Sequence, residues 1–277
     1  MSSDPFLDAP ALDSLLRSPA RPTVLDARWR LGGPSCRTEH AAGHIPGAMF
    51  VDVDTDICGP PGARGRHPLP DPAHLQAVLR RLGVVAPGLV VVYDGGDGLG
   101  AARTWWTLRW AGLPDVRVLE GGFPAWVENG FEVSRDIAVP TPSDLVVRPG
   151  QMPAVDASGA AELARAGRLI DVRAAERYRG EQEPIDTVAG HIPGAVNRPA
   201  QEAGADGQML PRAQLRRDHA LGAAPEELVG VSCGSGITAA RTVLAMTAAG
   251  QSPALYVGSW SDWITDPDRP VSTGPNP

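Results

Sequence analysis

This sequence of 277 residues contains no apolar run long enough to cross a membrane, and it has only three cysteines. A membrane-spanning helix needs about 18 or more consecutive apolar residues, and the start of the chain lacks the basic and apolar segments of a secretory signal. The number of cysteines is odd, and they lie at positions 36, 58 and 233 (Cys36, Cys58 and Cys233). They have neither Cys-x-x-Cys spacing nor a matching histidine pair. These absences predict a cytoplasmic protein without a disulfide framework or a zinc site, and the sequence implies no other cofactor.

Positive charge is also scarce. The chain has 25 Lys and Arg against 32 Asp and Glu, which gives a formal net charge of −7. This balance argues against general binding to nucleic acid or to an anionic membrane, because both attract basic surfaces. An anionic substrate would therefore need local groups to hold it. Glycine (32) and proline (28) separate the apolar runs rather than forming a tract, which is typical of a turn-rich globular protein.

One hexapeptide occurs twice. Residues 43–48 read Gly-His-Ile-Pro-Gly-Ala, and residues 190–195 repeat them. An apolar segment ending in Asp-x-Arg precedes each copy, at 25–28 and at 170–173. A second apolar segment follows each copy and leads into a Gly-rich loop, which opens with Asp94 in the first half and Cys233 in the second. Self-similarity on this scale predicts two copies of one domain, with the chemistry in the second copy.

Short apolar runs alternate with helical patterns in both halves. Strands are expected at 23–27, 89–93, 116–119, 168–172, 228–232 and 254–257. Helices are expected at 72–82, 100–111, 123–129, 158–166, 211–220 and 238–249, with Gly83, Gly130 and Gly250 ending three of them. This alternation predicts an α/β fold of two domains, each a mainly parallel sheet with helices on both faces. Prolines between 134 and 157 predict a linker at 141–157, between domains 1–140 and 158–277.

The loop Cys-Gly-Ser-Gly-Ile-Thr at 233–238 follows a strand and opens a helix. Ligands bind at this edge of open α/β sheets, and free N–H groups at the helix start favour an anion. The two glycines allow consecutive amides to turn inward. We expect the amides of residues 234–238 to stabilise a Cys233 thiolate, the nucleophilic form of cysteine.

Together, these motifs resemble the tandem-domain rhodanese superfamily of sulfurtransferases. The resemblance rests on the two hexapeptides, Asp171 to Arg173, the Arg-Tyr-Arg-Gly segment at 177–180 and the cysteine loop. It implies two rhodanese-like domains and a reaction in which Cys233 takes a sulfur atom from a small anionic donor and becomes a persulfide. The sulfur atom is then passed to a thiol or to cyanide. A thioredoxin-like protein could supply the acceptor thiol. The loop is similar to that of the 3-mercaptopyruvate branch, whereas thiosulfate-using relatives carry Arg and Lys at the positions of Gly234 and Ser235.

The resemblance also implies roles for individual residues. Arg177 corresponds to the arginine that binds the donor. The backbone of Gly234, Gly236, Ile237 and Thr238 is expected to contribute to the same substrate-binding site. A second arginine is common nine positions later, where this chain has Asp186. Ser235 is expected to relay a proton or to stabilise the leaving enolate, with His44 as its partner. His191 in the second hexapeptide is expected to be structural, and Asp94 to hydrogen-bond within its own turn.

Three alternatives remain open. Thiosulfate is the other candidate donor. A cysteine phosphatase could share the scaffold, but it needs an arginine six positions after the cysteine, where this chain has alanine. A non-catalytic docking protein for a sulfur carrier is the third alternative, against which the intact cysteine loop argues.

Overall fold

The computed structural model describes residues 4–200 and 227–277, which form two compact units. Of these residues, 4–59 and 70–151 belong to the first unit, and 60–69, 152–200 and 227–277 to the second. The division after residue 151 lies inside the predicted linker. Residues 60–69 belong to the second unit, although they lie within the predicted first domain. The predicted helix at 211–220 lies outside the described residues.

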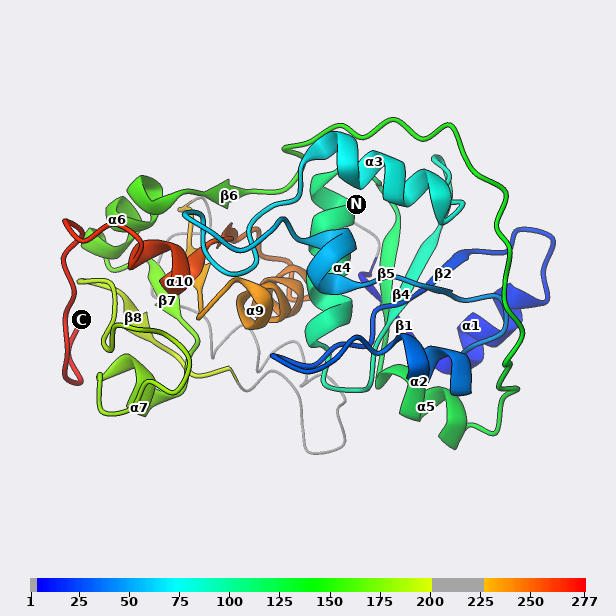
Figure 1. Ribbon diagram of the computed structural model, residues 1–277, viewed down its shortest axis with the longest axis horizontal. Helices are drawn as coiled ribbons and strands as arrows, with labels where there is room; N and C mark the ends of the chain where they lie inside the picture. Colours follow the sequence, from blue (N-terminus) through cyan, green and yellow to red (C-terminus); the bar gives the residue numbers. More distant parts are fainter. Residues whose placement is uncertain (1–3, 201–226) are drawn as a thin grey trace. The chain divides into compact units, whose positions relative to one another are not determined.

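Each unit is built on a five-stranded sheet in which every strand pair is parallel. From one edge to the other, the first sheet consists of β1 (Phe6–Leu7), β5 (Val116–Leu119), β4 (Val90–Tyr93), β2 (Thr23–Asp26) and β3 (Met49–Phe50). The second sheet consists of β6 (Ala154–Val155), β10 (Ala254–Tyr256), β9 (Gly230–Ser232), β7 (Leu169–Asp171) and β8 (Val196–Asn197). Strands of both sheets are labelled in Figure 1. When strands are numbered within each unit, the two orders are the same. The predicted duplication of an α/β domain with a parallel sheet is therefore confirmed.

The elements of the first unit, in chain order, are β1 (Phe6–Leu7), α1 (Ala9–Leu16), β2 (Thr23–Asp26), α2 (Arg37–Ala42), β3 (Met49–Phe50), the π-helical turn η1 (Val53–Ile57), α3 (Pro72–Arg81), β4 (Val90–Tyr93), α4 (Leu99–Trp110), β5 (Val116–Leu119) and α5 (Gly122–Glu128). Helix α3 begins where expected, because the Asp71 carboxylate accepts the N–H groups of Ala73 and His74 beside Pro72. Gly83 follows the helix with a φ of +70°, a conformation that favours glycine.

The elements of the second unit are β6 (Ala154–Val155), α6 (Ala157–Arg165), β7 (Leu169–Asp171), α7 (Ala175–Tyr178), β8 (Val196–Asn197), β9 (Gly230–Ser232), α9 (Ile237–Ala248), β10 (Ala254–Tyr256) and α10 (Ser259–Trp263). The last residues of the predicted linker thus form β6 and the start of α6. The two-residue edge strands β1, β3, β6 and β8 were not predicted, because two residues are too few to show a periodic pattern.

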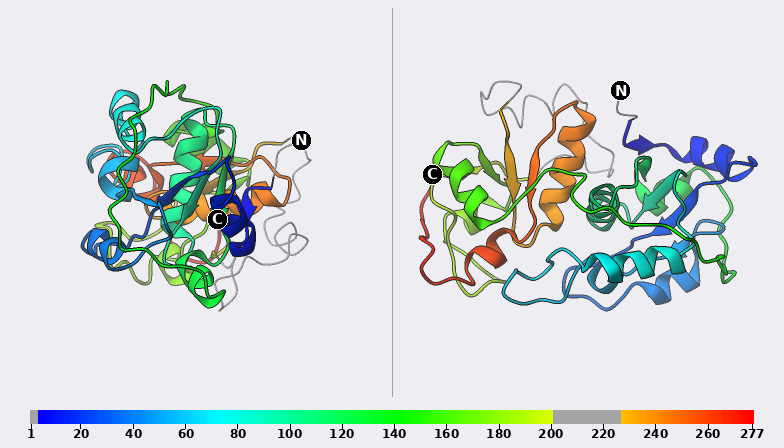
Figure 2. Two further views of the ribbon diagram at one scale, coloured as in Figure 1. Left: turned by 90° about the vertical axis from the view of Figure 1, so that its right-hand side faces the viewer. Right: turned by 90° about the horizontal axis from the view of Figure 1, so that it is seen from above.

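Helices cover both faces of each sheet. In the first unit, α1 and α5 pack on one face through Leu12 and Trp126, together with Val91 and Tyr93 of β4. Val90 and Val92 point to the opposite face, where α4 contacts β4 and β5. In the second unit, α6 and α10 share one hydrophobic core, and α9 contacts β9 and β10. The right-hand view of Figure 2 shows α9 (orange) and α6 (green) on opposite sides of the second sheet.

Candidate active site in the second unit

Cys233 lies between β9 and α9, at the carboxyl edge of the second sheet. Its side chain is buried, with 3 % of the residue exposed, and its Sγ accepts the N–H of Gly236 at 3.1 Å. Gly236 has a φ of +80° and precedes α9 as its N-cap residue. The predicted strand-to-helix loop is therefore present, and one of the five predicted amides donates to the sulfur. Ile237 and Thr238 form the first turn of α9 behind it.

The residues at the start of α10 hold the cysteine loop in place. The Ser259 hydroxyl accepts the N–H of Cys233 at 3.1 Å and donates to the carbonyl oxygen of Tyr256 at 2.8 Å. The N–H of Trp260 donates to the carbonyl oxygen of Cys233, and that of Ser261 to the carbonyl oxygen of Gly234. Within the described part of the chain, Ser259 is the one non-glycine residue with a positive φ, 52°. Such a backbone is costly for an L-residue, so the surrounding contacts must hold it.

Residues 60–69 supply further side chains to this loop. The Ser235 hydroxyl lies 2.7 Å from Nδ1 of His67, and both residues are buried. The N–H of Arg66 donates to the Ser261 hydroxyl at 3.0 Å. Gly65 approaches Gly258 and Ser261 so closely that a Cβ there would lie 2.8 Å from each. In Figure 1 the segment 60–69, in light blue, lies beside α10. The close approach at Gly65 therefore fixes Arg66 and His67 against the cysteine loop.

His44, the residue predicted to partner Ser235, belongs to the first unit. Its Nδ1 donates to the carbonyl oxygen of His40 at 2.8 Å, and its ring stacks on the His40 ring. His191 has equivalent contacts in the second unit, with the carbonyl oxygen and the ring of Tyr178. Each histidine also forms a backbone bridge, His44 to Ser134 and His191 to Ser272. The two hexapeptide histidines thus have matching contacts, and the histidine that contacts Ser235 is His67.

Arg177 is held by two carboxylates. Its Nε and Nη2 donate to Glu183 at 3.2 and 2.6 Å, and Nη2 also lies 3.2 Å from Asp186. Burial would raise the pKa of Glu183, but hydrogen bonds from Arg177 and from backbone N–H groups outweigh it and lower the pKa. Burial raises the pKa of Asp186, although Arg66 and Arg177 act in the opposite direction. These ion pairs orient the arginine that was predicted to bind the donor. It lies beside the cysteine loop, because a Cβ atom at Gly234 would be 3.6 Å from both its Nη1 and its Nη2.

In the first unit, the loop that follows β4 corresponds to the cysteine loop. The side chain of its first residue, Asp94, accepts hydrogen bonds from the backbone of this loop. The Asp94 carboxylate accepts the N–H groups of Gly96, Gly98 and Ala101 at 2.9, 3.2 and 3.0 Å. The predicted role of Asp94 within its turn is confirmed. Burial raises the pKa of Asp94 to about 6, although these three donors oppose the rise. The loop amides of the first unit are therefore occupied by a carboxylate that cannot accept sulfur.

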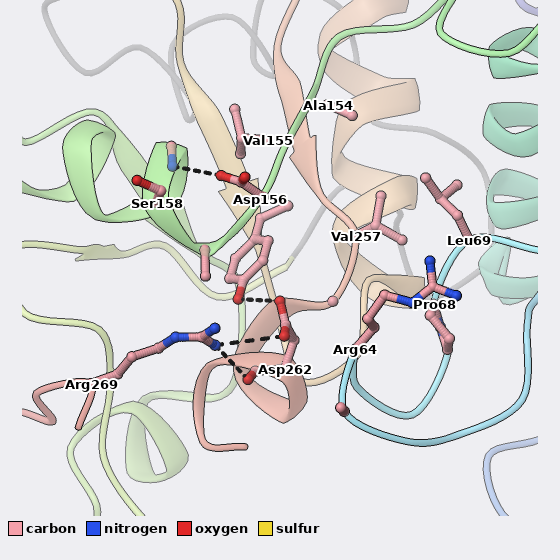
Figure 3. Close-up of a pocket in the computed structure, with 15 residues that line it drawn as sticks. Arg64, Pro68, Leu69, Ala154, Val155, Asp156, Ser158, Val257, Asp262 and Arg269 are labelled. Atoms are coloured by element: carbon pink, nitrogen blue, oxygen red, sulfur yellow. Dashed lines mark hydrogen bonds and ion pairs between the residues drawn. The ribbon is translucent and has the colours of Figure 1, made fainter. Parts of the chain in front are cut away.

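A pocket of about 800 Å³ lies elsewhere in the second unit, at the carboxyl ends of β6 and β10. Figure 3 shows it between Arg64 and Leu69 on one side and Val155 and Asp156 on the other. Cys233 is not among the residues that line this pocket, so the pocket and the cysteine loop are separate features. Across residues 4–200 and 227–277, no cluster of His, Cys, Asp or Glu could hold a metal ion. In the same ranges, no helix has both the length and the apolarity needed to span a membrane.

Comparison with known proteins agrees with this architecture. The family model of the rhodanese-like domain matches residues 9–129 and 156–266. A Pseudomonas aeruginosa protein, provisionally named a 3-mercaptopyruvate sulfurtransferase, is 45 % identical over 99 % of this chain and 100 % of its own length. A Mycobacterium tuberculosis protein, provisionally named a thiosulfate sulfurtransferase, SseB, is 41 % identical over 97 % of each chain.

A solved structure shows the same fold. SseA from Escherichia coli, described as a 3-mercaptopyruvate sulfotransferase with the rhodanese fold, superposes with a TM-score of 0.81 at 29 % identity. The alignment covers 94 % of this chain and 100 % of SseA. The resemblance predicted from the hexapeptides and the cysteine loop is thus confirmed: the chain belongs to the rhodanese-like family, and it carries two copies of the domain.

Proposed function

We propose that this protein transfers a sulfur atom from 3-mercaptopyruvate, through a persulfide on Cys233, to a thiol or to cyanide. The observation that carries the proposal is the arrangement around Sγ. The backbone N–H of Gly236 donates to the sulfur, and Ser235 of the same loop contacts His67 of the segment 60–69. An N–H at the start of a helix favours the thiolate, which is the nucleophilic form. The name of the Pseudomonas relative indicates the same donor.

In the first half-reaction, the Cys233 thiolate attacks the sulfur of the donor. A sulfur–sulfur bond forms, the carbon–sulfur bond breaks, and its electron pair remains on carbon as the enolate of pyruvate. The proton of the donor thiol then replaces sulfur on that carbon, so that the products are pyruvate and a Cys233 persulfide anion. In the second half-reaction, a thiolate or cyanide attacks the outer sulfur and regenerates the Cys233 thiolate.

We assign the proton transfer to Ser235 and His67. The hydroxyl and the ring nitrogen are 2.7 Å apart, a distance at which a proton can pass between them. His44 has the same contacts as the structural His191, and this equivalence argues against a separate role for it. His67 had no motif to mark it in the sequence.

The choice of donor rests on the charge of the loop. Gly234 and Ser235 add no cation to it, which suits a donor with one carboxylate and a reacting thiol better than a dianion. Arg177 can hold that carboxylate with its planar fork of N–H donors. Thiosulfate is the second candidate donor, and the name of the Mycobacterium tuberculosis relative supports it.

The experiment that tests this proposal compares kcat/KM for 3-mercaptopyruvate and thiosulfate on one preparation, by pyruvate release and thiocyanate formation. We expect 3-mercaptopyruvate to be preferred, and Cys233→Ser to abolish turnover of both donors while the protein keeps its Tm. Preference for thiosulfate would overturn the choice of donor. Turnover near the wild-type rate in Cys233→Ser would overturn the sulfurtransferase assignment. We propose the cytoplasm as the location, where small thiols and thioredoxin-like proteins are available as acceptors.

A further inference from the structure

Two guanidinium groups lie at one point of the cysteine loop. A Cβ atom at Gly234 would lie 3.0 Å from Nη2 of Arg66 and 3.6 Å from both Nη1 and Nη2 of Arg177. Gly234 directly follows Cys233, so both cations lie beside the loop that carries the reacting cysteine. A longer side chain at residue 234 would displace them. The absence of a side chain there leaves room for two arginines that come from outside the loop.

Some of the N–H groups facing this space are unused. Arg177 donates to Glu183 and Asp186 through Nε and Nη2, and Arg66 donates to Asp186 through Nη1. Among the residues that the structure describes, Nη1 of Arg177 and Nη2 of Arg66 have no acceptor, and the buried Nε of Arg66 has none. The buried Nε of Arg66 is a costly unpaired donor, and a carboxylate placed between the two guanidinium groups would accept from both.

Asp186 connects the two arginines. Its Oδ1 accepts from Nη1 of Arg66, and its Oδ2 accepts from Nη2 of Arg177 at 3.2 Å. The Asp186 side chain is 4 % exposed, and the Arg66 side chain 26 %. One buried carboxylate therefore sets the spacing of the two guanidinium groups. The family resemblance implies an arginine at position 186, and the aspartate there instead pairs with an arginine 120 positions earlier.

We propose that Arg66 is the second residue that binds the carboxylate of the sulfur donor, and that Asp186 is the residue that positions it. This inference rests on the proposed function. In this arrangement the donor carboxylate bridges Nη2 of Arg66 and Nη1 of Arg177 above Gly234. Its thiol is directed toward Sγ of Cys233. The donors selected are small 2-oxo acids with a thiol on the next carbon.

Steady-state kinetics with a charged and a neutral donor test the role of Arg66. The neutral donor is mercaptoacetone, which has the same keto-thiol group without the carboxylate. We expect Arg66→Gln to raise KM for 3-mercaptopyruvate about tenfold, the loss typical of one charge-assisted hydrogen bond. KM for mercaptoacetone should not change. The control is Arg64→Gln, an exposed arginine two residues away that lines the separate pocket. Equal effects of Arg66→Gln on both donors would show a merely structural role and would overturn the proposal.

A second measurement does not depend on turnover. Cys233 is alkylated with iodoacetate, which carries a carboxylate, and with iodoacetamide, which does not, and the rates are read by mass on the Cys233 peptide. We expect Arg66→Gln to lower the ratio of the two rates several-fold, and Arg64→Gln to leave it unchanged. An unchanged ratio in Arg66→Gln would overturn the role of Arg66. If the wild-type protein turned over no 3-mercaptopyruvate, the proposed function would fail while this ratio still tested Arg66.

Exchange of the two charges tests the positioning role. Arg66→Asp alone should lose the affinity for 3-mercaptopyruvate, because it places two carboxylates together. The double variant Arg66→Asp with Asp186→Arg restores the ion pair and returns a cation to the same point. We expect it to recover much of the lost kcat/KM and of the alkylation ratio. A double variant no better than Arg66→Asp would overturn the role of Asp186.

Discussion

The contact between His67 and Ser235 predicts that His67→Gln slows sulfur transfer from 3-mercaptopyruvate through kcat. The two atoms lie 2.7 Å apart, and both residues are less than 10 % exposed, so bulk water cannot easily replace the ring. A positioned acid or base contributes about 10²–10⁴-fold. We therefore expect kcat to fall by at least about 10²-fold. KM should change little, because the arginines hold the donor.

The assay is initial-rate pyruvate release by three variants, His67→Gln, Ser235→Ala and the double variant. Because the two groups act as one relay, the double variant should be no slower than the slower single variant. His44→Gln and His191→Gln change equivalent histidines in the two hexapeptides and serve as the matched controls. We expect both to lower Tm and to leave kcat within a few-fold of wild type. A normal kcat in His67→Gln, or a large loss confined to His44→Gln, would refute this reasoning.

Further predictions concern the supports of the two loops. Ser259→Ala should lower the unfolding free energy by about 2–4 kcal/mol, because two buried hydrogen-bonding groups lose their partner. Ser259→Gly should lower it less, because glycine adopts the positive φ without strain. Equal losses for the two variants in urea denaturation would contradict backbone strain at Ser259. Gly234→Ala should raise KM for 3-mercaptopyruvate several-fold, since its Cβ would lie 3.0 Å from Arg66, and an unchanged KM would show that the arginine can move freely. The folded-state pKa of Asp94, about 6, lies above its usual 3.8, so the folded state binds the extra proton. The unfolding free energy should therefore fall as pH rises from about 4 to 6, by about 3 kcal/mol in all from this group, and Asp94→Asn should flatten that part of the profile; identical profiles would refute the assignment.

Much of the fold could be predicted from local patterns. The buried strand β4 reads as an uninterrupted valine run, and Asp71, Pro72 and Gly83 mark the ends of α3 in the order that capping requires. The repeated hexapeptide predicted that the second sheet would copy the first. The same local signals located the Cys233 loop, because a strand, a Gly-rich turn and a helix follow one another in sequence.

The rest of the site depends on contacts between distant segments. Ser235 and His67 are separated by 168 positions, and Arg66 and Asp186 by 120. No local pattern links residues so far apart. The segment 60–69 has only one clue, a run of Arg, Gly, Arg and His next to proline, in a chain with few cations. The glycine at position 65 permits the close approach that brings this run to the loop, and that contact is visible only in three dimensions.

The central claim is that Cys233 carries the transferred sulfur, and intact-protein and peptide mass spectrometry test it most directly. The protein is mixed with 3-mercaptopyruvate without an acceptor, and the Cys233 peptide is weighed beside those of the buried Cys36 and Cys58. We predict one added sulfur atom on Cys233, none on the other two cysteines, and its loss when cyanide is added. A Cys233 peptide of unchanged mass while pyruvate is released would contradict the account.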